Sequence, residues 1–248
     1  SAAAVSGASE GGAEAPIGVH DIAFTLLRRL CAHEERRGQA AEAGAIGAVL
    51  SAMRAHPKDA SLQAGGCRTL LSLCAGQATV AAAASPRAVL DVDAEARVAG
   101  DEGRCMLAAE AGVLDVLASV LETYGPPKDP ATAPEGDKRE RALRRSAMKH
   151  AVLCVLALTY GSVIRAHWAV QAGVVTALST AARRARMPGA QPLPFADKID
   201  LARQWLEMQA RLLGPRSIMR DVVPRNSSNE RAGRGGRTAI DAPPALIV

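Results

Sequence analysis

Three segments of the chain share one order of polar, small and apolar positions. Residues 36–44, 104–112 and 165–173 each begin with Arg and end with a small residue and Gly, with Glu or Gln two positions before the Gly. A short apolar stretch begins directly after each Gly. Because small residues let helices turn sharply and approach closely, the pattern predicts two helices that meet at a glycine corner, three times along the chain.

A second, longer kind of apolar segment lies between these corners. Residues 27–32, 70–75 and 155–160 resemble one another in their Leu, Ala and Cys or Thr positions. The helix predicted over residues 146–160 is apolar nearly all round from Ala151 onward. Such a helix has to be covered on several sides, and stacked helical units would provide that cover.

The three glycines lie 68 and 61 residues apart, which is too long for one helical repeat. Two stretches with poor helix propensity account for the excess, about 76–101 and 125–136, and the second holds four prolines, which a helix interior does not tolerate. Without these insertions the units are roughly 40 to 47 residues long, the period of armadillo and HEAT repeats. The interval from Gly173 to Gly214 is already 41 residues.

The pattern resembles armadillo repeats, and residues 59–74 match the loop and third helix of such a unit best. The resemblance extends over about residues 17–214. It implies an all-α, right-handed solenoid of about three repeats, in which the third helices line a concave binding groove. Nuclear import receptors of this family use a ladder of Asn in the groove, but here Asn occurs only at 226 and 229, so import is not expected.

Both ends of the chain differ from this pattern. Residues 1–15 are rich in Ala, Gly and Ser and predict a flexible arm. Residues 16–214 are the predicted repeat domain. Residues 215–248 are rich in Arg, Gly, Pro and Asn and predict an extended basic tail.

Composition agrees with helices, since Ala is abundant and Phe, Tyr and Trp occur only twice each. The longest apolar run, residues 151–158, is well short of the roughly 20 residues that span a bilayer, so no membrane span is expected. The five cysteines are scattered without a CxxC pair, which predicts a reducing, intracellular compartment. The sequence leaves open whether this is the cytoplasm or an organelle.

The net charge of +5 is concentrated in a few basic clusters. Each cluster is either a solvated face or a contact surface for acidic protein or nucleic acid. Trp205 is either an aromatic anchor for a partner or a core residue. The candidate partner-binding residues are Arg141, Arg145 and Lys149, at i, i+4 and i+8 of a third helix; Arg183, Arg184 and Arg186; Trp205; and, in an Arg-Gly-Gly-Arg segment of the tail, Arg234 and Arg237.

The motifs of common enzymes are missing from the sequence. There is no phosphate-binding GxxxxGK[ST] motif, and His33-Glu34 lacks the second histidine of a zinc-protease helix. Cys67 and Cys74 share a helix face, but cysteines at equivalent repeat positions are typical of packing residues. We therefore predict no catalytic, cofactor-binding or metal-binding residues.

Three hypotheses follow for the function. The first is a non-catalytic scaffold that binds protein partners within a larger assembly. The second is an accessory subunit of a ribonucleoprotein particle, such as an organellar ribosome, whose basic clusters contact RNA phosphates. The third is an enzyme with an unrecognised thiol.

Overall fold

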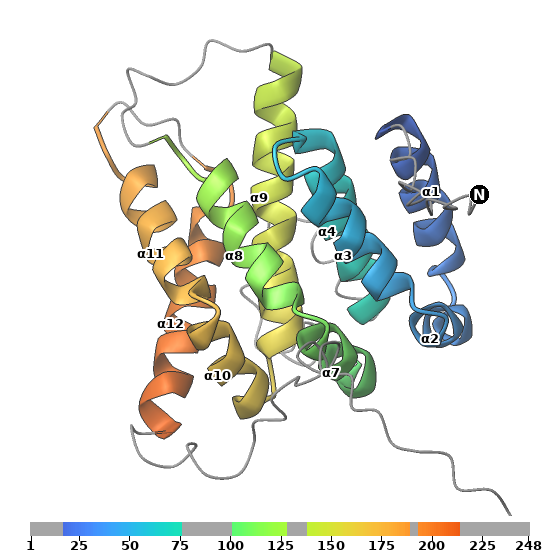
Figure 1. Cartoon of the computed structure of the whole chain (residues 1–248). Coiled ribbons are helices and arrows are strands. Elements are labelled where there is room, and N and C mark those ends of the chain that lie inside the picture. Colours follow the sequence, from blue (N-terminus) through green and yellow to red (C-terminus); the bar gives the residue numbers. More distant parts are fainter. Residues whose placement is uncertain (1–16, 76–100, 128–137, 189–192, 214–248) are drawn as a thin grey trace, which may run out of the picture. The chain divides into compact units, whose positions relative to one another are not determined.

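The computed structural model describes residues 17–75, 101–127, 138–188 and 193–213, and every element within them is a helix (Figure 1). The prediction of an all-α fold is therefore confirmed. Chain contacts divide the protein after Leu212, and the helices described here form the first of the two units. In chain order the helices are α1 (Ile17–Leu30), α2 (Glu34–Glu42), α3 (Ala45–Ala55), α4 (Ala60–Cys74), α7 (Glu102–Glu110), α8 (Val113–Tyr124), α9 (Lys138–Thr159), α10 (Val163–Gln171), α11 (Val174–Ala185) and α12 (Ala196–Leu213).

The three predicted glycine corners have the same local geometry. Gly44, Gly112 and Gly173 join α2 to α3, α7 to α8 and α10 to α11, with φ angles of 82°, 81° and 80°. In each case the helix before the corner has nine residues. A left-handed φ is strained for residues with a Cβ, so glycine is the residue that suits this position. We call these three glycines, with the alanine before each, the corners.

Polar side chains fix the start of three helices. Asp59 and Asp101 accept hydrogen bonds from the backbone N–H groups of Leu62 and Arg104, both at 2.9 Å. Ser162 accepts one from the N–H of Arg165 at 3.4 Å. These N-caps satisfy donors that lack a partner in the first turn of a helix.

Helices α4 and α9 form the centre of the core. α4 packs along α9, and α1 and α8 pack on α4 and α9 respectively (Figure 1). Every residue of α9 from Ala151 to Thr159 is buried, as its sequence predicts. Within the described residues, no helix combines the length and the apolar character needed to cross a bilayer.

The predicted insertions begin where helices end. α4 ends at Cys74 and α8 ends at Tyr124. Most of both insertions, the arm 1–15 and the tail 215–248 lie outside the described residues, so those boundaries stay predictions.

Buried arginines link successive corner helices. Arg104 on α7 and Arg165 on α10 are 9% and 1% exposed. Arg104 donates to Glu34 at the start of α2, and Arg165 donates to Glu102 at the start of α7. The same Arg-to-Glu contact thus joins the first helix of one corner to the first helix of the next, twice over.

One position of the sequence pattern was misaligned. The pattern places Arg36 with Arg104 and Arg165, but Arg36 is exposed and Arg37 is 3% exposed. Arg37 is the residue that donates to the backbone carbonyl of Ala75, directly after α4, and to Glu34. Because adjacent helical residues point about 100° apart, only one of the two can face the core.

Candidate functional site

A cavity of about 470 Å³ lies where α4, α9 and the start of α12 meet. Among the described residues that line it, four carry cationic side chains and none is Asp or Glu. The lining residues are Arg68, Ala142, Arg145, Ser146, Lys149, His150, Pro194, Phe195 and Lys198. We call this the basic cavity.

The four cations come from three helices. α4 supplies Arg68, and α9 supplies Arg145 and Lys149, which lie one turn apart on the same helix face. Lys198 belongs to the first turn of α12, and its N–H donates to the carbonyl of Phe195 at 3.1 Å. Phe195 is 4% exposed, so it anchors this turn in the core next to the cavity.

A polar network connects α4 to α9 at the cavity wall. The guanidinium of Arg68 donates to the hydroxyl of Ser146 at 3.4 Å, and Nδ1 of His150 donates to the carbonyl of Ser146 at 2.7 Å. Burial, together with the nearby charges of Arg68 and Lys149, lowers the pKa of His150 to about 4. The imidazole is therefore neutral at pH 7 and adds no fifth charge.

Lys198 is the most deeply buried cation of the cavity. Its residue is 3% exposed, and among the described residues its ammonium group forms no ion pair or hydrogen bond, although the neighbouring Asp197 acts on its charge. Burial lowers the pKa of Lys198, the charge of Lys149 adds to the effect, and the charge of Asp197 opposes it. Because Lys198 lines the cavity, an anion that enters the cavity can pair with it.

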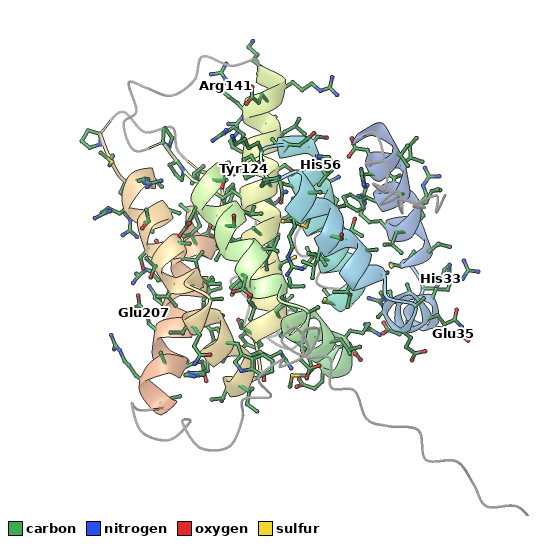
Figure 2. The ribbon with its side chains drawn as sticks, in the orientation of Figure 1. His33, Glu35, His56, Tyr124, Arg141 and Glu207 are labelled. Carbon is green, nitrogen blue, oxygen red and sulfur yellow. The ribbon has the colours of Figure 1, made fainter. Side chains whose placement is uncertain are left out.

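The structure brings together part of the predicted stripe on α9. Arg145 and Lys149 line the cavity, whereas Arg141, near the start of the helix, does not (Figure 2). Arg144, in the same basic cluster, donates to the carbonyl of Thr123 at 3.0 Å and lies 5.3 Å from the centre of the Tyr124 ring. That arginine joins α9 to the end of α8.

The chain matches no family model, no curated protein and no solved structure. Its own residues are therefore the basis for assigning a function.

The other candidate residues lie apart from the cavity. Arg183 is exposed on α11, Arg184 donates to the carbonyl of Pro126 at 3.2 Å, and Arg186 forms an ion pair with Asp200. The Trp205 ring stacks on the Tyr160 ring with centroids 4.7 Å apart and packs against the core. Arg234 and Arg237 lie outside the described residues.

The five cysteines are all buried and unpaired. Burial raises the pKa of Cys67 to about 12 and also raises that of Cys154. A hydrogen bond between Cys74 and Cys105 lowers the pKa of Cys105 and, with burial, raises that of Cys74. Cys105 itself is 0% exposed, so a substrate has no open path to its sulfur.

A second cavity, of about 580 Å³, lies between α1 and α3. It is larger than the basic cavity, but its lining is mostly alanine and other apolar side chains, with His20 and His56 at its edge. The described residues of its lining include no group of like charges, so this cavity does not indicate a class of ligand.

Sequence reasoning missed Arg68, His150 and Lys198. Arg68 lies in the segment that matches a third helix best, so the groove expected from the resemblance was the signal that leads to it. Lys198 carries no such signal, because nothing near it in sequence indicates that its side chain is buried.

Proposed function

We propose that the protein is a non-catalytic binding scaffold of about three armadillo-like repeats, which holds an acidic segment of a partner protein at the basic cavity. The observation that carries the proposal is that four cations from three helices line one cavity, to which the described part of the chain contributes no carboxylate. Charges of one sign around a cleft concentrate their field there and favour a ligand of the opposite sign.

Two regularities support the armadillo-like arrangement. The first is the common geometry of the corners at Gly44, Gly112 and Gly173. The second is the Arg-to-Glu contact that recurs between successive corner helices. In such an arrangement α4, α9 and α12 are the third helices of successive repeats, and the basic cavity lies on the groove side.

The packing of Phe195 and Trp205 favours a protein partner over RNA. Single-stranded RNA is usually held by exposed aromatic faces on which bases stack. Phe195 at the cavity is 4% exposed, and Trp205 is stacked on Tyr160. Phosphate contacts alone would remain for RNA, so an acidic polypeptide fits the lining better.

The test reverses two charges at the rim of the cavity. We expect Arg145→Glu with Lys149→Glu to abolish the capture of partner proteins from native extract, as measured by crosslinking and quantitative mass spectrometry. The matched control is Arg36→Glu with Arg29→Glu, because both arginines are exposed and lie on α2 and α1, which do not line the cavity.

Binding between the purified protein and the strongest captured partner should then show the same difference between the two double variants. Equal loss in both would contradict a specific site. Capture that depends on RNA, and that ribonuclease treatment removes, would favour the ribonucleoprotein hypothesis instead.

A further inference from the structure

Lys198 differs from the other buried cations of the protein. Arg37, Arg104 and Arg165 are each 9% exposed or less, and each donates to a glutamate. Lys198 is 3% exposed and forms no ion pair among the described residues; only the neighbouring Asp197 opposes the effect of burial on its charge, and the residue lines an open cavity. A cation that the fold leaves unpaired in this way is suited to an anion that comes from outside.

The number and kind of donors indicate which anion. A phosphate monoester carries about −1.5 to −2 charges at pH 7 and offers three strong acceptor oxygens, whereas a carboxylate carries one charge and two oxygens. The cavity offers two guanidinium groups, Arg68 and Arg145, and two ammonium groups. Guanidinium groups match phosphate oxygens with paired hydrogen bonds, and lysine supplies a compact charge.

The cavity also has the right size and access. Its volume of about 470 Å³ is larger than a lone phosphate needs, so the ester can enter with part of the chain that carries it. Arg68 is held toward α9 by its hydrogen bond to Ser146. One donor is thus already oriented before a ligand binds, which lowers the entropic cost of binding.

We propose that the basic cavity is a phosphoryl-binding site, with Lys198 at its base and Arg68, Arg145 and Lys149 around the phosphate oxygens. This rests on the proposed function in one respect: the phosphate ester is a phosphorylated side chain of the partner protein. Lys198 then completes its coordination only in the complex, so binding depends on whether the partner is phosphorylated.

The direct test uses three small probes: phosphoserine with blocked termini, inorganic phosphate, and glutamate with blocked termini. Binding is followed through the ring signals of His150 in nuclear magnetic resonance spectra, because this residue lines the cavity. We expect both phosphate probes to bind and capped glutamate to bind at least tenfold more weakly. Bound phosphate should also raise the pKa of His150, since it offsets the charges of Arg68 and Lys149.

The decisive variant is Lys198→Met, which keeps the length of the side chain and removes its charge. It should weaken binding of capped phosphoserine at least tenfold, without lowering the thermal unfolding midpoint. A residue with a purely structural role would lower that midpoint instead. Lys149→Gln, at a partly exposed position, should weaken binding less, and Arg36→Met, on α2, should leave it unchanged.

The outcomes separate this inference from the scaffold proposal. Phosphate probes that leave the His150 signals unmoved, or that bind Lys198→Met as well as the unmodified protein, would overturn the phosphoryl site. If partner capture depends on Arg145 and Lys149 but survives phosphatase treatment and Lys198→Met, the scaffold proposal stands and the phosphoryl site falls. If the phosphate probes bind as expected but no protein depends on the cavity, the site stands with a free phosphate ester as its ligand, and the scaffold proposal falls.

Discussion

The buried cations of this protein differ in whether the fold gives them an anionic partner. Near the corners, Arg104 and Arg165 each meet a glutamate, and Arg165 also donates to backbone carbonyls at the end of α9. At the basic cavity, the residue Lys198 is as deeply buried but forms no ion pair among the described residues, although the neighbouring Asp197 acts on its charge. Pairing marks the first group as part of the scaffold, and the absence of pairing in the second indicates a place for a ligand.

The most direct test of this difference replaces a paired and an unpaired cation by the same residue, as Arg165→Met and Lys198→Met. The larger effect is expected for Arg165→Met. The substitution removes the guanidinium that donates to the buried carbonyl of Leu158 and that pairs with Glu102. We expect unfolding to become easier by about 3 kcal/mol, measured by chemical denaturation. Arg183→Met, at an exposed position of α11, is the control and should change stability by less than about 0.5 kcal/mol. A small effect at Arg165 would remove the distinction between the two groups.

Acid should lower the stability of the folded protein through His150, which lines the basic cavity. Its pKa is about 4 in the folded protein and about 6.5 when unfolded, so between these values the unfolded chain binds the extra proton. Stability therefore falls as the pH drops from about 6.5 to about 4, by about 2 kcal/mol from this residue. Urea denaturation across that range should be less pH-dependent for His150→Gln than for the unmodified protein. Equal slopes would show that the ring is not held neutral by its surroundings.

The corners can be strained without replacing a charged residue. In Gly112→Ala the residue keeps a φ of 81°, and the new Cβ lies 2.9 Å from Nη2 of Arg54, which donates to the carbonyls of Ala111 and Gly112. We expect a loss of about 1 to 2 kcal/mol in thermal unfolding. Gly47→Ala, inside α3 with open space around its Cβ, should instead be neutral or stabilising. The same result at both positions would argue against a strained corner.

The smallest expected change in stability is a gain, not a loss. Lys198→Met removes an ammonium group that burial and the charge of Lys149 disfavour, and it should stabilise the free protein by less than about 1 kcal/mol. Differential scanning calorimetry in a buffer without phosphate measures it. Destabilisation comparable to that of Arg165→Met would mean that Lys198 belongs with the paired cations after all.

Much of the local structure could be predicted from the sequence. The error in the corner helices was a shift of one residue, which corresponds to a rotation around the helix axis. The three corners were found because a left-handed turn favours Gly and a nine-residue helix before it leaves a regular spacing. The choice between Arg36 and Arg37 failed, since two adjacent arginines look alike in sequence and only the position of Ala75 decides which one is buried. Trp205 was left open between two roles, and the stacking on Tyr160 depends on a residue 45 positions away.

The sequence by itself determined the helices, the corners and two of the four cavity cations, because periodicity, glycine and capping residues act over a few neighbouring positions. The basic cavity was decided only by the tertiary structure. Arg68, Lys149 and Lys198 come from three different helices, and their burial and mutual repulsion exist only once those helices have packed. Local patterns report how a segment folds, whereas a binding site depends on which segments meet.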